Sequence, residues 1–208
     1  EGAMEFITAH HNEVICSIAH SNATYEVAKK AVDLGAASIT HLFNGMSPFN
    51  HREPGIVGAA FDSDCMVELI SDGNFVCPTV MRAVFKMFGD DRIIMISDGI
   101  RATGGEEGIY DFGGRSYIVK NEIAMMEDGS LVAPVISLRQ SLKKMVKQFG
   151  IPLESAVRCA TYNPAKLLNL LDQYGVIKAG NYADLLLLDQ DLNVNMVFKK
   201  GKLVYKAQ

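Results

Sequence analysis

The sequence predicts an α/β protein that consists of half of a parallel (β/α)8 barrel and part of a small β-domain. Three observations lead to this prediction. Four short apolar runs in the first half each end on a polar residue, helical segments stand between most of them, and the second half changes to strands and turns. Strands that alternate with helices indicate a parallel sheet. Four such strands are half of an eight-stranded barrel.

The first hundred residues supply the predicted half-barrel. A helix is expected at the very start, over residues 1–8. The apolar runs cover residues 14–18, 38–40, 66–70 and 92–96. One helix is predicted after Asn22, a candidate N-cap, and ends at Gly35. Another begins at Pro78 and runs through Phe88, with Gly89 after it. Residues 44–58 are rich in Gly and Pro and predict a long loop.

The second half has a different character. Residues 108–126 alternate around turn signals at Gly113 and Asn121, which predicts a β-hairpin insertion. Apolar residues between Leu138 and Phe149 follow helical spacing, and Pro152 and Pro164 mark two further helices. Strands are expected over 183–188 and 196–205, with a turn at Lys200. We therefore predict a partial barrel over residues 1–175 and β-domain strands over 176–208.

Composition excludes several classes of function. The chain is 49% hydrophobic and 21% charged, with a net charge of −4, so it lacks the basic face that nucleic acids require. No apolar run approaches the roughly 18 residues of a membrane span. The chain opens at Glu1 without a Met or a basic signal segment, and we expect it to be part of a longer, cytoplasmic protein. Its four cysteines are far apart and predict buried free thiols in a reducing compartment.

Three of the polar residues that follow apolar runs suggest metal chemistry. His20, His41 and Asp98 each stand at the end of a predicted strand, and the carboxyl ends of barrel strands carry active sites. Imidazole is a good ligand for zinc, iron, manganese or cobalt, and a carboxylate beside such an ion can act as a base. Two histidines that share one ion should have ring nitrogens roughly 3–4 Å apart. Taken singly, each residue favours a structural role; the three together favour a structural role and metal chemistry equally.

The loop that follows His41 contains a second candidate feature. His51 and Arg52 stand together in it, and a guanidinium group suits the bidentate binding of a phosphate. The alternative is a solvated surface loop in which Arg52 pairs with Glu53.

Several segments resemble the signatures of N-acetylglucosamine-6-phosphate deacetylases of the amidohydrolase superfamily. The resemblance runs over nearly the whole chain, and its segments occur in the family's order. These segments are residues 20–25, 40–46, 51–55, 96–98, 101–104 and 179–185. The last is the least specific, because amidohydrolases in general share it.

The resemblance implies the C-terminal half of a TIM-like, metal-dependent hydrolase barrel plus part of a small β-sandwich, in a homodimer. The implied reaction is hydrolysis of the acetamide of N-acetylglucosamine 6-phosphate, with a divalent metal ion as cofactor. His20 and His41 match the family's metal ligands, and Asp98 matches its catalytic aspartate. A sugar phosphate is the implied partner. Its contacts fall on Asn44, Gly45, His51, Arg52, Asp72, Phe75, Leu131, Val132 and Ala133.

The chain also departs from the family's pattern. The family's metal-binding glutamate lies on an earlier strand that has no counterpart here. Phe75 stands where a substrate-contacting histidine is usual, and it can neither donate nor accept that hydrogen bond. Pro134 changes a loop of small residues and removes a backbone donor. Two alternatives therefore stay open: a related amidohydrolase with another amide substrate, and a non-catalytic homologue that binds a sugar phosphate.

Overall fold

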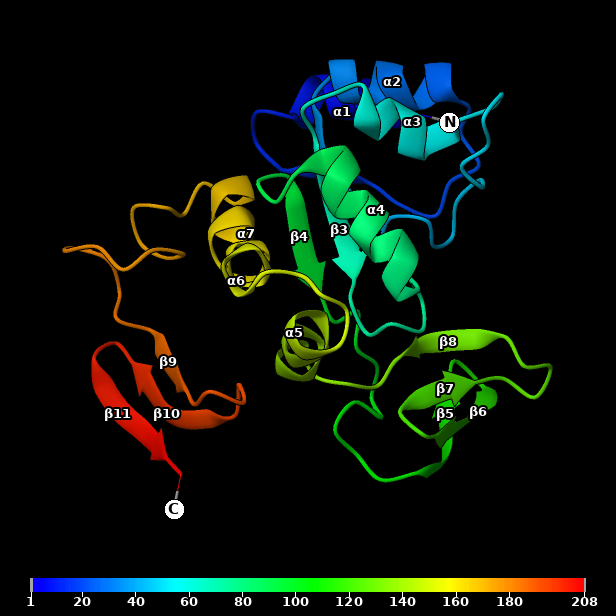
Figure 1. Ribbon diagram of the computed structural model, residues 1–208. Coiled ribbons are helices and arrows are strands. Elements are labelled where there is room, and N and C mark those ends of the chain that lie inside the picture. The colour runs from blue at the N-terminus through cyan, green and yellow to red at the C-terminus, as the bar shows by residue number, and fades with distance from the viewer. Residues whose placement is uncertain (1, 208) are drawn as a thin grey trace.

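The computed structural model describes residues 2–207, and its first sheet is the predicted half-barrel (Figure 1). Its strands lie side by side in chain order, and all neighbouring pairs are parallel. They are β1 (Cys16–Ile18), β2 (Ala36–Ile39), β3 (Met66–Ile70) and β4 (Ile93–Ile96). Parallel order places the carboxyl ends of all four strands at one edge of the sheet.

Helices cover one face of this sheet and enclose the main core. In the described residues they are α1 (Ala3–His10), α2 (Tyr25–Asp33), α3 (Gly55–Phe61), α4 (Pro78–Phe88), α5 (Leu138–Lys147), α6 (Leu153–Ala160) and α7 (Tyr162–Leu167). Helix α2 packs on β2, and α6 and α7 pack on β4. None of these helices has both the length and the apolar composition needed to cross a bilayer.

The two faces of the half-barrel sheet differ in chemistry because strand side chains alternate. One face enters the core beneath the helices with Ile39, Val67, Leu69, Ile93 and Met95. The strand register puts a second set on the opposite face: Ser17, Ser38, Thr40, Glu68 and Ile94. On that face the hydroxyl groups of Ser17 and Thr40 lie 2.6 Å apart. The concave interior of the half-barrel is therefore partly polar.

Local sequence signals predicted some elements well and others poorly. The bounds of β3 and α4 are confirmed, and Gly89 ends α4 with a positive φ of 69°. The predicted N-cap Asn22 is wrong, since Thr24 caps α2 and its side chain accepts a hydrogen bond from the Val27 N–H. The predicted loop over 44–58 is also wrong at its end, where α3 begins at Gly55.

The second sheet contains the predicted hairpin as β5 and β6, and extends it to four antiparallel strands in the order β5-β6-β7-β8. They are β5 (Gly108–Phe112), β6 (Arg115–Lys120), β7 (Ile123–Met125) and β8 (Leu131–Pro134). Their small core includes Ala102, which lies in the loop after Asp98. Thr103 Oγ1 donates to the Pro134 carbonyl at 3.3 Å, and Gly104 N donates to the Val135 carbonyl at 3.2 Å. This sheet is thus joined to the loop that follows Asp98.

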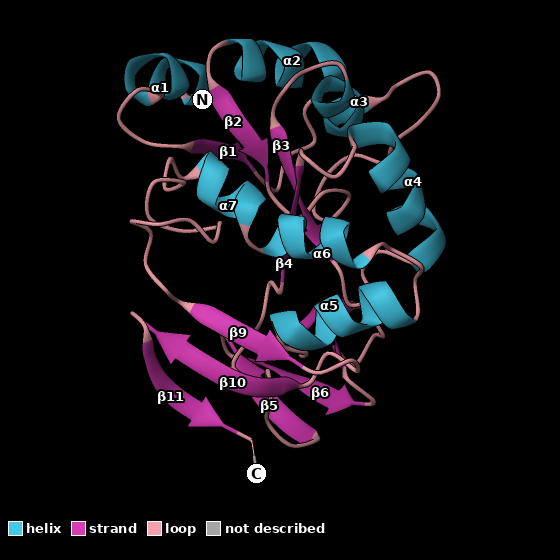
Figure 2. Ribbon diagram, turned by 60° about the vertical axis from the view of Figure 1, so that its left-hand side comes forward, coloured by secondary structure: helices cyan, strands magenta, loops and turns pink. Residues whose placement is uncertain are grey.

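The third sheet contains the last strands, β9 (Leu185–Leu188), β10 (Val194–Lys199) and β11 (Lys202–Lys206), all antiparallel. The expected break at Lys200 is confirmed as a turn between β10 and β11. Figure 2 shows this sheet in the lower part of the view, below α5. Lys143 on α5 donates to the Asn193 side chain at 2.9 Å, and Lys147 donates to the Gln190 carbonyl at 2.7 Å. These contacts fasten the sheet to the helical layer.

All four cysteines are free. Cys65 and Cys159 are buried, as predicted, and Cys16 is half-buried. Cys77 is exposed just before α4, so the prediction of buried thiols is wrong at that position.

Candidate active site at the carboxyl edge of the half-barrel

Four polar residues stand at equivalent places along the carboxyl edge of the parallel sheet. His20, His41, Asp72 and Asp98 each come two positions after the last residue of their strand. Because neighbouring strands are parallel, the equivalent positions follow one another along the edge. In an α/β barrel this edge carries the catalytic groups. The topology thus brings four residues that are far apart in sequence to one rim.

The two histidines converge on each other. Their Nε2 atoms lie 2.8 Å apart, and the rings meet edge to face at an interplanar angle of 75°. His41 is buried, with 5% of its surface exposed, whereas His20 is exposed. The separation is shorter than the roughly 3–4 Å expected for two ligands of one ion, and it is a hydrogen-bond distance. In this geometry one imidazole donates and the other accepts.

The histidine pair fits part of a divalent metal site. The two Nε2 atoms are in direct contact, and zinc–nitrogen bonds of about 2.0–2.1 Å need the rings to separate by only a few tenths of an ångström. Nδ1 of His41 is buried without a hydrogen-bond partner. Within residues 2–207, no group of three or more His, Cys, Asp or Glu side chains is placed to hold an ion. Among the described residues, two side chains at the rim could therefore hold such an ion, with no third candidate ligand grouped with them.

The backbone at this edge is strained. His20, His41 and Asp98 have φ values of 44°, 34° and 44°, in the left-handed region that residues with a Cβ rarely adopt. Strain of this kind costs on the order of 1–3 kcal/mol per residue and clusters at functional sites. Three of the four rim residues have this strained backbone conformation, which distinguishes them from ordinary residues at strand ends.

The turn after His41 is held by Asn44. Its backbone N–H donates to the His41 carbonyl at 2.9 Å, and its side-chain amide donates to the carbonyls of His41 and Leu42 at 3.3 and 3.2 Å. Gly45 follows with a φ of 60°, and a Cβ at this position would lie 3.1 Å from Nδ1 of His20. Three His20 ring atoms would be 3.1–3.3 Å from that Cβ, so Gly45 lies against the face of the ring. Asn44 and Gly45 therefore shape the histidine pair itself.

The other predicted substrate residues have more varied surroundings. His51 and Arg52 are exposed, and Arg52 forms no ion pair within residues 2–207. The alternative in which Arg52 pairs with Glu53 therefore receives no support. Asp72 is buried, and its Oδ1 accepts the backbone N–H groups of Asn74 and Phe75 at 2.9 and 3.1 Å. That oxygen holds the turn after β3 and orients the half-buried Phe75.

Residues 132–135 were expected to form a loop, and this expectation is wrong for Val132, Ala133 and Pro134. Leu131, Val132 and Ala133 lie on β8, which pairs with β7. Leu131 is exposed, Val132 and Ala133 are half-buried, and Val132 packs on the small core of the second sheet. The end of β8 is linked to the loop after Asp98 by hydrogen bonds that Thr103 and Gly104 donate to the carbonyls of Pro134 and Val135.

One residue of this region was missed by the sequence analysis. Glu68 is the only charged side chain within the four parallel strands. It is half-buried, and burial raises the pKa of its carboxyl group. The backbone N–H of His41 opposes this rise by hydrogen bonding, as does the His41 imidazole by its charge, while the charge of Asp98 adds to it. The feature of the sequence that could have identified Glu68 is that it is a single acidic residue within an apolar strand.

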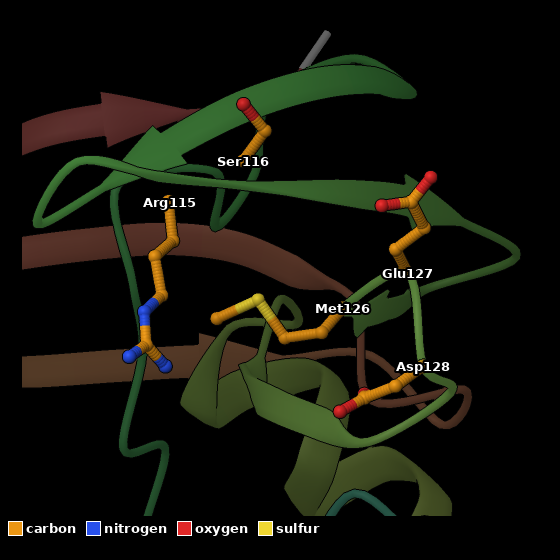
Figure 3. A pocket seen from close by; sticks show the side chains of 5 residues that line it. All are labelled: Arg115, Ser116, Met126, Glu127 and Asp128. Carbon is orange, nitrogen blue, oxygen red and sulfur yellow. The ribbon is translucent and has the colours of Figure 1, made fainter.

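A hollow on the surface lies away from this rim. It is lined by Arg115, Ser116, Met126, Glu127 and Asp128 on the second sheet (Figure 3). Figure 3 shows the Arg115 and Asp128 side chains extending beside Met126, while Glu127 points away. Oδ1 of Asp128 already accepts the backbone N–H and the hydroxyl of Ser130. None of the rim residues lines this hollow, so it does not enlarge the candidate site.

Comparisons with known proteins agree with this geometry. The family model described as "Amidohydrolase family" matches residues 1–204. N-acetylglucosamine-6-phosphate deacetylase of Vibrio furnissii is 34% identical over 206 residues, which is 99% of this chain and 51% of that protein. N-acetylgalactosamine-6-phosphate deacetylase of Escherichia coli O157:H7 is 31% identical over 205 residues, which is 98% of this chain and 54% of that protein.

Solved structures give the same result. A variant of the N-acetyl-D-glucosamine-6-phosphate deacetylase of Mycobacterium smegmatis, in complex with N-acetyl-D-glucosamine-6-phosphate, superposes with a TM-score of 0.91 at 34% identity. The match covers 98% of this chain and 55% of that one. The chain thus spans about half the length of the relatives that it matches.

Proposed function

The chain belongs to the amidohydrolase family, and on that premise we propose that it is the C-terminal part of a sugar-phosphate deacetylase. The proposed reaction hydrolyses the acetamide of N-acetylglucosamine 6-phosphate to glucosamine 6-phosphate and acetate. The observation that carries the proposal is the convergence of His20 and His41 at 2.8 Å, with Asp98 at the equivalent position on the same rim.

His20 and His41 are the proposed protein ligands of a divalent metal ion. When bound, such an ion polarises an amide carbonyl and activates water for attack. His41 is the fixed member of the pair, because it is buried, and the exposed His20 ring is held between His41 and Gly45. Zinc, iron, manganese and cobalt all suit imidazole ligands.

Asp98 is the proposed general base and acid. It is exposed at the rim two residues after β4, where a carboxylate can take a proton from the attacking water. The same group then returns the proton to the nitrogen of the leaving amine, because hydrolysis needs a proton there when the C–N bond breaks. This single residue accounts for both proton transfers.

The phosphate and sugar are assigned to the loops around the rim. Arg52 is exposed and without an ion pair in the described chain, so its guanidinium is available to a phosphate. Asn44 and Gly45 border His20, and the turn from Asp72 to Phe75 follows the neighbouring strand. Leu131, Val132 and Ala133 complete the proposed sugar-binding residues, with His51 beside Arg52. We propose a homodimer in which the phosphate contact of Arg52 is made within a subunit or across the interface.

Three alternatives differ in substrate or in class. The relatives include deacetylases of both N-acetylglucosamine and N-acetylgalactosamine 6-phosphates, at 34% and 31% identity. A related amidohydrolase with another amide substrate would use the same histidines and Asp98. A non-catalytic sugar-phosphate-binding protein is favoured by Phe75, which lacks the hydrogen bond that a histidine offers.

Steady-state kinetics of the longer protein that contains this chain would test the proposal. The protein is stripped of metal, reloaded with zinc, iron, manganese or cobalt, and assayed for acetate release. Substrates are the two N-acetylhexosamine 6-phosphates and unphosphorylated N-acetylglucosamine. We expect metal-dependent turnover of about 1 per second or more on a phosphorylated substrate and much slower turnover on unphosphorylated N-acetylglucosamine. Binding of the sugar phosphate without turnover in any metal would favour the non-catalytic alternative.

A further inference from the structure

The loop that follows Asp98 leaves β4 and passes to the second sheet. Asp98 is exposed and has a φ of 44°, so burial of its own side chain does not hold that strained conformation. Such a conformation persists where the surrounding structure fixes the backbone on both sides. On the preceding side, β4 is fixed by its parallel pairing with β3. On the following side, the contacts come from the turn over residues 100–103.

The Thr103 hydroxyl joins this turn to β8. Its Oγ1 accepts the backbone N–H of Ile100 at 2.9 Å and donates to the Pro134 carbonyl at 3.3 Å. The backbone N–H of Thr103 donates in return to the Ile100 carbonyl at 2.8 Å. A hydroxyl group can donate and accept at the same time. One side chain therefore connects the backbone two residues after Asp98 with the end of β8.

The same side chain lies against Gly99, the residue directly after Asp98. A Cβ on Gly99 would be 2.9 Å from Oγ1 of Thr103 and 3.5 Å from its Cγ2. The first distance is too short for a real Cβ, so a larger residue at position 99 would displace the hydroxyl. Gly99 does not have a left-handed φ. The contact with Thr103, and not the backbone conformation, therefore accounts for glycine at this position.

Other contacts hold the turn on the second sheet without the hydroxyl. Ala102 is 1% exposed within the small core of that sheet, and Ile100 packs against the same core. The backbone N–H of Gly104 donates to the Val135 carbonyl at 3.2 Å. A variant that lacks the Thr103 hydroxyl should therefore keep the fold of the sheet and lose the bond to the Ile100 N–H.

We infer that Thr103 is a positioning residue for Asp98. Its hydroxyl fixes the backbone that follows Asp98, and so keeps the carboxylate where it can take a proton from the attacking water. Thr103 acts through Asp98 and does not itself touch substrate. The inference rests on the proposed function in so far as Asp98 is the general base. The hydrogen bonds to Ile100 and Pro134 are independent of that function.

Two substitutions separate the hydroxyl from the rest of the side chain. Thr103→Val replaces the hydroxyl by a methyl group, whereas Thr103→Ser keeps it. Thr161→Val is the matched control, because the exposed Thr161 at the end of α6 also uses its hydroxyl in a backbone hydrogen bond, to the Val157 carbonyl at 2.7 Å. All variants are made in the longer protein that contains this chain.

Amide hydrogen exchange over residues 96–104 tests the hold on the loop and requires neither metal nor activity. We expect the Ile100 N–H to exchange about three- to tenfold faster in Thr103→Val, the change for losing one neutral hydrogen bond. In Thr103→Ser and Thr161→Val the rate should stay within about twofold of wild type. Equal exchange in wild type and Thr103→Val would refute the inference, whether or not the protein is a deacetylase.

Steady-state kinetics test whether this hold acts on catalysis. We expect kcat to fall about 10- to 100-fold in Thr103→Val, since a displacement of about 1 Å at a reacting group can cost about a hundredfold in rate. KM and metal content should stay within about twofold of wild type, and Thr103→Ser should restore most of the rate. A wild-type kcat in Thr103→Val, or a parallel loss of metal and rate, would overturn the positioning role.

A double variant tests whether Thr103 acts through Asp98. In the Asp98→Asn background, adding Thr103→Val should change kcat by less than about twofold, because the effects of residues that act as a unit are not additive. The same fractional loss of kcat in both backgrounds would show that Thr103 acts elsewhere.

Gly99→Ala is a second route to the same displacement and decides the matter if Thr103→Val does not fold. The added methyl group would displace Oγ1 of Thr103. We expect kcat to fall and Ile100 to exchange faster, as in Thr103→Val, and wild-type values of both would overturn the inference. A wild-type protein without turnover on any sugar phosphate would count against the proposed function. Exchange at Ile100 would then still decide whether Thr103 holds the loop after Asp98.

Discussion

Nε2 of His41 lies 2.8 Å from Nε2 of His20, although helix α2 and strand β2 lie between the two residues in the chain. The contact depends on parallel pairing of β1 with β2, which places Ile18 opposite Ile39 and so brings both strand ends to the same level. The Thr40 N–H donates to the Ile18 carbonyl at 2.9 Å and continues this pairing beyond the strands.

Replacing His20 should remove metal without unfolding the protein. His20 is exposed, so His20→Gln leaves the core intact but deletes one of two converging imidazole ligands. We expect the metal content of the longer protein, measured by elemental analysis after dialysis, to fall to about a tenth of wild type or less. His10→Gln on α1 is the matched control. Full metal occupancy in His20→Gln would exclude this residue as a ligand.

Replacing Asp98 should separate catalysis from binding. Asp98→Asn preserves size but cannot accept the water proton, so kcat should fall about 10²- to 10⁴-fold. The KM for the sugar phosphate and the metal content should change little, because the residue is proposed to act on the attacking water. Asp64→Asn, at an exposed position after α3, serves as control. A comparable kcat in Asp98→Asn would make Asp98 structural.

Replacing Arg52 should have the opposite effect. Arg52→Ala removes a charged hydrogen-bond donor to phosphate, and we expect KM to rise about 10- to 100-fold while kcat stays near wild type. The defect should vanish when the substrate is unphosphorylated, since the lost partner is then absent. The exposed Arg139→Ala is the matched control. An equal loss with phosphorylated and unphosphorylated substrates would contradict a phosphate contact.

A polypeptide of these 208 residues alone should associate and lack deacetylase activity. Within residues 2–207, β1 and β4 each pair with one neighbour, which leaves an unpaired edge on both sides of the parallel sheet. Such edges promote association. Sedimentation and an acetate assay with added zinc test both points. A monomer that turns over about once per second or faster would show that the half-barrel is sufficient.

The cysteines should differ sharply in reactivity. Burial raises the pKa of the Cys159 thiol to about 12, so at pH 8 its thiolate fraction is about a thousandfold below that of an ordinary cysteine. Cys77 is exposed and should react first with a thiol reagent. Mass spectrometry of the labelled peptides distinguishes the two sites, and Cys77→Ser should remove the fast phase. Early labelling of Cys159 in the folded chain would show that the site opens readily.

The sequence by itself determined the elements whose signals are local. The apolar run of β3 and the Pro78 start and Gly89 end of α4 predicted both elements with their observed bounds, because strand burial and helix capping depend on adjacent residues. The alternation of such elements also predicted a parallel sheet, and the polar residue after each strand predicted a rim. The same local reasoning failed at α3, where burial of Ile56 and Val57 in the core outweighs the loop signals of the surrounding glycines and proline.

Only the tertiary structure decided which side chains meet. Periodicity tells which face of a strand is buried, but it does not tell which residue lies across from it on the next strand. The sequence predicted that His20 and His41 lie close together at adjacent strand ends, but their direct 2.8 Å contact follows from the β1–β2 register. The hydrogen bond from the Leu42 N–H to the Glu68 carbonyl likewise follows from the β2–β3 register. Both are contacts between residues more than 20 positions apart. They exist because the parallel sheet sets its strands side by side, a non-local arrangement that no single segment specifies.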